Sequence, residues 1–123
     1  MDRPLVAWGE VTLDCRDTAV VSSFWAALFG VEASPTQPDG WYTLGPMVKG
    51  GPLINFQPVP EKKQGKARMH LDVWVDDLDR AISLVERLGG RDTGERHKYE
   101  SGTVEVMADP EGNEFCLVAS AKP

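Results

Sequence analysis

The sequence predicts an α+β fold made of two tandem βαβββ modules, whose curved mixed sheets form a shared cleft. Three observations predict it: a pattern that repeats after about 60 residues, a helical stripe after the first strand of each copy, and short strands separated by Gly- and Pro-rich turns. The chain has 123 residues, of which 41% are hydrophobic and 26% charged. A chain of this length can bury a core without a metal or disulfide, so we expect one domain over residues 1–123.

Each copy of the repeat begins with a strand that ends in an aspartate. Residues 10–17 (EVTLDCRD) and 70–77 (HLDVWVDD) both alternate polar or large side chains with aliphatic ones, as a half-buried strand does. The terminal aspartates, Asp17 and Asp77, are expected to cap the following helices by accepting hydrogen bonds from first-turn amides.

A helix is expected after each aspartate, because apolar residues recur there at i, i+3, i+4 and i+7. Gly30 and Gly90 are expected to end the two helices, since glycine accepts the left-handed conformation at which helices often stop. The apolar stripes are Val21, Phe24, Trp25 and Leu28 in the first copy, and Leu78, Ile82, Val85 and Leu88 in the second.

Short strands are expected beyond each glycine. Segments 35–40, 50–52 and 109–113 are rich in turn residues and separate them. The expected strands are 41–44 and 53–57 in the first copy and 103–107 and 114–118 in the second, with weaker ones near 31–33 and 91–93.

This pattern divides the chain into three parts. Module 1 covers about residues 6–59, a linker covers residues 60–67, and module 2 covers about residues 68–119. The linker holds the only basic run, Glu61 to Arg68, which lacks interleaved aromatic residues and is expected to be solvated. With 19 acidic and 13 basic residues, the net charge of -6 argues against a nucleic-acid partner.

No run of about 20 apolar residues and no secretory signal pattern is present, so we expect no membrane partner and a cytoplasmic location. The two cysteines, Cys15 and Cys116, are far apart in the sequence and are expected to be free thiols.

Because side chains alternate along a strand, each strand is expected to present one face to a helix and the other to the cleft. Ile54, Phe56, Phe115 and Leu117 are the natural helix-facing set in the last strands. The cleft-facing set is then Glu10, Thr12, Asp14, Asn55, Gln57, His70, Asp72, Trp74, Glu114 and Cys116. Glu114 is interpreted as a rim residue, and His97 as part of an exposed loop beside Arg96 and Lys98.

The paired modules, the two opening strands and above all the Asp109–Leu117 segment (DPEGNEFCL) resemble the vicinal oxygen chelate superfamily. The closest likeness is to glyoxalase-like, bleomycin-resistance-type proteins, and it covers about residues 6–119. The resemblance implies the glyoxalase/bleomycin resistance/dioxygenase fold. It also implies a homodimer, because members of this superfamily commonly pair chains.

Metal-using members of the superfamily place four ligands at positions that fall here on Glu10, Gln57, His70 and Cys116. His70 and Glu10 match the ligand types, whereas an uncharged amide and a thiol stand at the other two positions. We therefore expect an incomplete metal site and no cofactor. The alternative is a divalent ion such as Zn, Ni, Fe or Mn, because the softer of these ions accept Glu, His and Cys together.

The favoured function is a small-molecule-binding protein that encloses an aromatic or hydrophobic metabolite or antibiotic. Its expected contacts are Trp8, Glu10, Trp41, Gln57, His70, Trp74 and Cys116, with the tryptophans as walls. The alternative is a metal-dependent lyase, isomerase or dioxygenase with Glu10 and His70 as ligands. In either case, the residues expected to carry any catalysis are Glu10 and His70, which could also act as acid or base without a metal.

Overall fold

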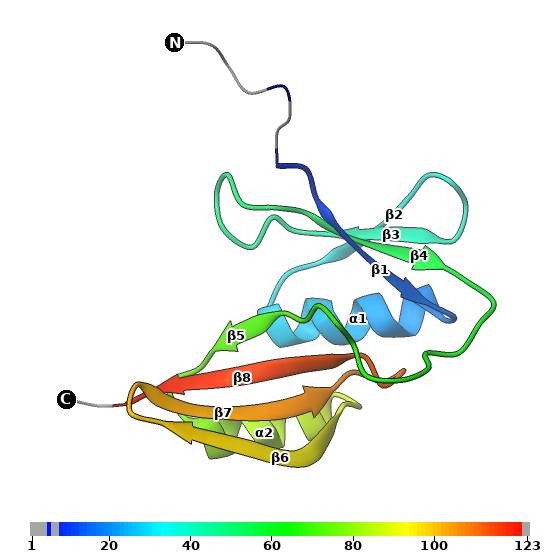
Figure 1. The fold of residues 1–123 in the computed structure, drawn as a ribbon. Helices are drawn as coiled ribbons and strands as arrows, with labels where there is room; N and C mark the ends of the chain where they lie inside the picture. Colours follow the sequence, from blue (N-terminus) through cyan, green and yellow to red (C-terminus); the bar gives the residue numbers. More distant parts are fainter. Residues whose placement is uncertain (1–4, 6–7, 122–123) are drawn as a thin grey trace. The chain divides into compact units, whose positions relative to one another are not determined.

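The computed structural model describes Leu5 and residues 8–121, and the expected start of module 1 at residue 6 lies outside this part. The chain divides into two compact units, residues 1–60 and residues 61–123. Each unit holds one four-stranded mixed sheet and one helix, in the order strand, helix and three strands (Figure 1). The predicted α+β fold with βαβββ modules is confirmed.

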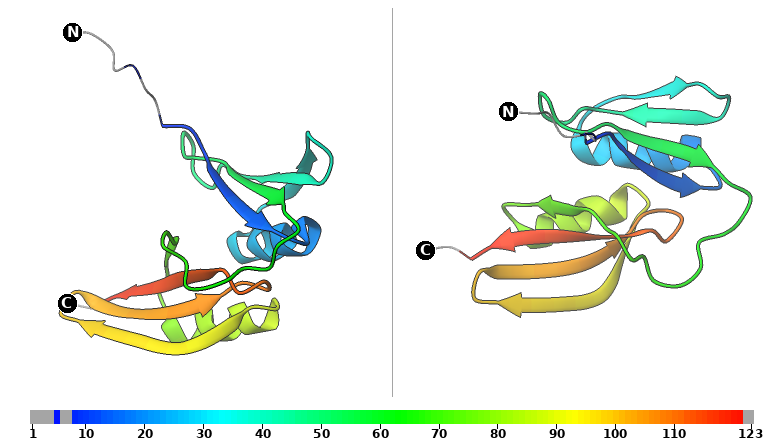
Figure 2. Two further views of the ribbon diagram at one scale, coloured as in Figure 1. Left: turned by 45° about the vertical axis from the view of Figure 1, so that its right-hand side comes forward. Right: turned by 45° about the horizontal axis from the view of Figure 1, so that its top comes forward.

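The first unit contains one helix and four strands in the sheet order β1-β4-β3-β2. β1 pairs with β4 in parallel, whereas the other neighbours are antiparallel. α1 packs on one face of this sheet (Figure 2). The elements are β1 (Val11–Cys15), α1 (Thr18–Phe29), β2 (Ala33–Thr36), β3 (Trp41–Leu44) and β4 (Ile54–Pro58).

The core of this unit lies between α1 and the sheet, as its apolar stripe predicts. Val21, Phe24 and Trp25 are buried on the helix, and the buried sheet residues include Leu44 and Phe56. The rings of Phe24 and Trp25 meet edge to face, with centroids 5.5 Å apart. Trp25 is therefore a core residue, which explains why this tryptophan contributes to packing rather than to a ligand site.

The second unit repeats the arrangement with the sheet order β5-β8-β7-β6, in which β5 and β8 are parallel. α2 packs against β6, β7 and β8 (Figure 2). The elements are β5 (Asp72–Trp74), α2 (Leu78–Arg87), β6 (Arg91–Tyr99), β7 (Gly102–Ala108) and β8 (Glu114–Ser120).

Both helices begin at the predicted caps. Asp17 accepts a hydrogen bond from the Val20 amide and Asp77 from the Arg80 amide, each at 3.1 Å. α1 ends as predicted at Gly30, which has φ 69°. For α2 the prediction of Gly90 is wrong, because Gly89 has φ 104° and takes the left-handed conformation one residue earlier.

Two edge strands are longer than expected. β2 begins at Ala33, later than the expected strand near 31–33, and continues to Thr36. It includes Pro35, which was expected in the turn over 35–40 and is tolerated because an edge strand leaves one side of the backbone unpaired. β6 runs to Tyr99, so the interpretation of His97 as loop is wrong. Its pairing with β7 shifts between Asp92 and Arg96, and this irregularity includes Gly94 with φ 84°. The bulge interrupts the simple alternation that a longer strand would have shown in the sequence.

The turn between β7 and β8 depends on a buried carboxylate. Asp109 is 2% exposed, and its carboxylate accepts hydrogen bonds from the Glu111 amide, the Asn113 amide and the Asn113 side chain. Gly112 donates its amide to the Asp109 carbonyl and has φ 87°, a conformation that favours glycine. The DPEGN sequence thus fixes the hairpin that sets β8 beside β7.

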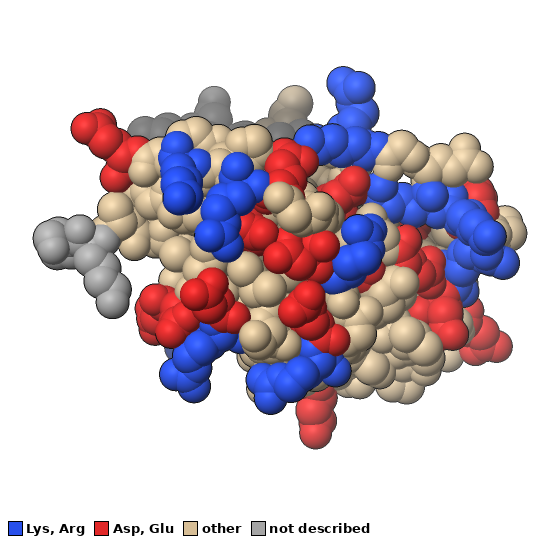
Figure 3. Space-filling view, turned by 90° about the horizontal axis from the view of Figure 1, so that it is seen from below, with Lys and Arg blue, Asp and Glu red and all other residues tan. Residues whose placement is uncertain are grey.

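Neither helix among the described residues has the length and apolar character needed to cross a membrane. On the face drawn in Figure 3, Lys and Arg side chains lie interspersed with Asp and Glu side chains.

Replacing Asp109 with Ala should destabilise the protein. The substitution leaves the partly buried amide donors of Glu111 and Asn113 without their acceptor, so we expect the free energy of unfolding to fall by about 1–3 kcal/mol. Urea denaturation of the full chain measures this, with Asp76→Ala, at an exposed position, as the control. Equal unfolding free energies for the two variants would contradict the role assigned to the Asp109 carboxylate.

Candidate functional site

A cavity of about 400 Å³ lies in the second unit, on the sheet face opposite α2. Strand alternation explains its lining. Phe115 and Leu117 on β8 are fully buried, as the predicted helix-facing set requires, whereas Cys116 and Val118 line the cavity. The residues that line it are Lys66, Ala67, His70, Asp72, Glu95, His97, Tyr99, Val104, Val106, Glu114, Cys116 and Val118.

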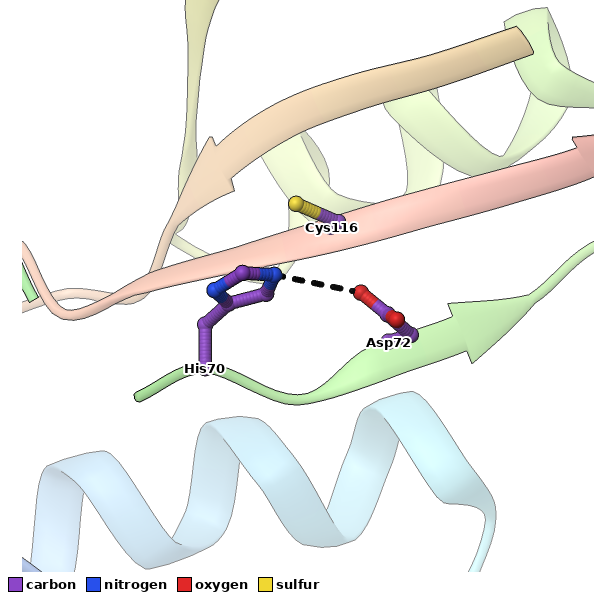
Figure 4. A group of neighbouring side chains, drawn as sticks. All are labelled: His70, Asp72 and Cys116. Atoms are coloured by element: carbon purple, nitrogen blue, oxygen red, sulfur yellow. Dashed lines mark ion pairs between the residues drawn. The ribbon is translucent and has the colours of Figure 1, made fainter. Parts of the chain in front are cut away.

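Three potential ligand side chains gather at one end of the cavity. The imidazole of His70, the carboxylate of Asp72 and the thiol of Cys116 have ligand atoms within 4.8 Å of one another (Figure 4). Parallel pairing places Asp72 directly beside Cys116, and His70 lies two residues before Asp72. His70 Nε2 is 3.3 Å from Asp72 Oδ1.

Cys116 is the buried member of this group, at 6% exposure. Burial raises the pKa of the Cys116 thiol, and the carboxylates of Asp72 and Glu95 raise it further. The thiol is therefore protonated at neutral pH and is a weak nucleophile. A metal ion could still bind it by displacing the proton, because metal binding to cysteine is coupled to proton release.

Glu114 anchors the chain segment that enters this unit. Its carboxylate lies 2.9 Å from Lys63 Nζ and accepts a hydrogen bond from the Ala67 amide, also at 2.9 Å. Burial opposes ionisation of this carboxyl, but the hydrogen bonds from Lys63 and Ala67 outweigh it, so the pKa of Glu114 lies below its usual value. Glu114 thus lines the cavity as an already paired acid.

A second histidine and carboxylate pair lies on β6. His97 Nε2 is 2.6 Å from Glu95 Oε2, and Lys66 Nζ is 3.8 Å from the same oxygen. The hydrogen bond from His97, and then the charge of Lys66, lower the pKa of Glu95. The His97 ring also stacks on Tyr99, with centroids 6.3 Å apart. Residues 95–99 (ERHKY) show no apolar and polar alternation, so the sequence carries no periodic signal for this cavity-lining row.

The other predicted site residues are distributed over both units. Trp8 (73% exposed) and Glu10 are exposed in the first unit, where Trp41 and Gln57 are partly buried. Trp74 belongs to the second unit but is 75% exposed and does not line the cavity. The predicted cleft between the modules, and the meeting of Glu10 with His70, stay predictions.

The polar face of the first sheet is already hydrogen-bonded internally. Thr43 donates to Asn55 Oδ1 at 2.8 Å, and the Thr36 and Thr43 hydroxyls are 3.2 Å apart. This chain of contacts explains how Asn55 is buried on that face without an unsatisfied amide oxygen.

The group His70, Asp72 and Cys116 suits a particular class of metal ion. One nitrogen, one oxygen and one sulfur atom match the preferences of Zn²⁺, Ni²⁺ or Fe²⁺ better than those of Mg²⁺, which requires several oxygen ligands. Three protein ligands leave a coordination position for a water or substrate. Sequence reasoning placed Asp72 on the correct face but did not identify it as a potential ligand.

Comparison with known proteins identifies the family. A family model described as a glyoxalase-like domain matches residues 10–118. No curated protein sequence matches the chain.

Several solved structures share the fold. A glyoxalase/bleomycin resistance protein/dioxygenase family enzyme from Burkholderia phytofirmans PsJN has a TM-score of 0.75 at 19% identity, covering 92% of this chain and 98% of its own. The fosfomycin resistance protein FosX from Mesorhizobium loti has a TM-score of 0.69 at 17% identity, covering 96% and 95%. A mutant FosX from Listeria monocytogenes, complexed with Mn(II) and a dihydroxypropylphosphonic acid, has a TM-score of 0.75 at 16% identity, covering 96% and 93%.

Since the family model spans nearly the whole of the two βαβββ modules, the chain belongs to the glyoxalase-like domain family, and the solved structures share its fold.

Proposed function

We propose that this protein binds a small, largely apolar molecule in the cavity of its second unit. The observation that carries the proposal is the cavity of about 400 Å³, which has an apolar floor and polar groups at its borders. This volume and this mixture of surfaces are typical of small-molecule sites. A metabolite or an antibiotic with a hydrophobic or aromatic body is the class that such a lining favours.

The floor and the borders have different roles in this proposal. Val104, Val106 and Val118 offer apolar surface, so displacing water from them favours binding of an apolar body. His70 and Asp72 are exposed and can orient a polar substituent at one end. The tryptophan walls and the contacts of Glu10 and Gln57 remain predictions from the sequence.

A second candidate function is a metal-dependent lyase, isomerase or dioxygenase. The observation that favours it is that the potential ligand atoms of His70, Asp72 and Cys116 all lie within 4.8 Å of one another. A bound divalent ion would supply Lewis-acid polarisation of substrate oxygens. The manganese complex of the Listeria FosX relative adds support for metal use within this fold.

The homodimer implied by the superfamily resemblance also stays a prediction. Sedimentation velocity of the full chain separates a dimer from a monomer directly.

Filling the cavity should weaken binding of a neutral apolar dye. We expect N-phenyl-1-naphthylamine to fluoresce on binding, and Val104→Phe to weaken this binding at least about tenfold, because the larger ring occupies the floor. Fluorescence titration measures it. Lys98→Phe is the matched control, since it adds the same ring at an exposed β6 position outside the lining. Unchanged dye affinity in Val104→Phe would contradict the proposed site.

Binding of Co²⁺ tests the second candidate function, the metal-dependent enzyme. We expect Co²⁺ to give a thiolate charge-transfer absorption band that Cys116→Ser abolishes, while His70→Gln and Asp72→Asn each weaken Co²⁺ binding at least about tenfold. Cys15→Ser, which removes the other buried thiol, should leave the band unchanged. The same titration of Glu10→Gln and Gln57→Leu tests whether these residues also serve as ligands. A band that survives Cys116→Ser would exclude the proposed ligand set.

A further inference from the structure

We propose that His97, held by Glu95, is a hydrogen-bond acceptor at the β6 side of the cavity, and that the ligand is an apolar molecule that carries a hydroxyl or N–H group. This inference rests on the proposed small-molecule function and defines the chemical class of the ligand. It assigns a specificity role to two β6 residues that lie outside the His70, Asp72 and Cys116 group.

The first step is the assignment of the donor in the pair. The separation of 2.6 Å between His97 Nε2 and Glu95 Oε2 is a short hydrogen bond. Because the pKa of Glu95 is lowered by this bond and by Lys66, the carboxylate is ionised at neutral pH and can only accept. Nε2 must therefore carry the proton.

The second step concerns the other ring nitrogen. In a neutral imidazole with its proton on Nε2, the Nδ1 atom is an acceptor. Within the described part of the chain, Glu95 is the hydrogen-bond partner of His97, and its bond is made through Nε2. Stacking on Tyr99 adds a second restraint on the ring, so the Nδ1 acceptor has a fixed direction. A carboxylate that orients a histidine and fixes its tautomer is the arrangement that acid-base sites use.

The third step is the position of this acceptor in the cavity. β7 lies between β6 and β8, so the side chains of Val104 and Val106 separate the β6 pair from Cys116. A ligand with an apolar body over these valines would bring a substituent at its edge to His97. The complementary substituent for an unprotonated Nδ1 is an O–H or N–H donor.

The stability of the fold does not explain why His97 and Glu95 are paired. His97 and Glu95 are about half exposed, and a hydrogen bond between side chains this exposed contributes little to stability. Arg96, which points to the other face of β6, already anchors the strand through a 2.5 Å contact with the buried Glu105. The position of His97 in the cavity lining is therefore better explained by ligand contact than by strand pairing.

Two matched probes test this inference. 2-Naphthol has a hydroxyl donor, whereas 2-methoxynaphthalene has the same ring system without one. We expect calorimetric titration of the full chain to give about tenfold tighter binding of 2-naphthol, the value of one well-formed hydrogen bond. His97→Phe should reduce this preference to about one.

The Glu95→Gln variant and NMR give independent readouts. Without the carboxylate the His97 tautomer is no longer fixed, so Glu95→Gln should lower the preference for 2-naphthol several-fold. In protein labelled with ¹⁵N-histidine, 2-naphthol should shift the Nδ1 resonance of His97 while Nε2 keeps its proton. Lys98→Ala, at an exposed β6 position outside the lining, is the control and should retain the wild-type preference.

The outcomes separate this inference from the proposed function. Equal binding of the two probes to the wild-type protein, or a preference that survives His97→Phe, overturns the role of His97 but leaves a small-molecule cavity. Failure of both probes and of the neutral dye to bind overturns the proposed function, and the inference with it.

Discussion

The alternation of side chains along β8 is the constraint on which the second unit depends. Phe115 and Leu117 must be buried beneath α2, so Cys116 and Val118 are directed to the opposite face. Parallel pairing with β5 then sets Asp72 beside Cys116, and antiparallel pairing with β7 sets Val106 on its other side. The hairpin fixed by Asp109 holds this register, because a slip of one residue would exchange the buried and cavity faces.

Much of this architecture could be predicted from residues that act locally. Asp17 and Asp77 cap helices through their own side chains, and the apolar stripe around Phe24 and Trp25 follows the helical period. The face of each central strand followed from alternation as well. What could not be predicted was the extent of β6, because the bulge near Gly94 breaks the alternation and because the charged neighbours of His97 suggest a loop.

The candidate site, like the fold, could be predicted from the sequence only in part. Alternation placed His70, Asp72 and Cys116 on one face, but the distances among them depend on how β5 and β8 pair, which the sequence does not state. Lys63 and Lys66 were interpreted as solvated linker residues. Lys66 is exposed as expected, at 70% of its side chain, and lies 3.8 Å from Glu95, whereas Lys63 is only 19% exposed and pairs with Glu114. Lys66 and Ala67 also line the cavity, so the linker contributes to it. Pairings between residues this far apart leave no periodic signal.

One feature of the lining bears on the evolution of this fold. Within the described part of the chain, every residue that lines the cavity lies between Lys66 and Val118, in the second unit. A duplicated gene could therefore preserve the pocket in one copy while the other copy diverged freely. The first module keeps the strand pattern and the helix caps, yet it has the amide side chain of Asn55 beside Thr12 at the register position where the second module has the Cys116 thiol beside Asp72.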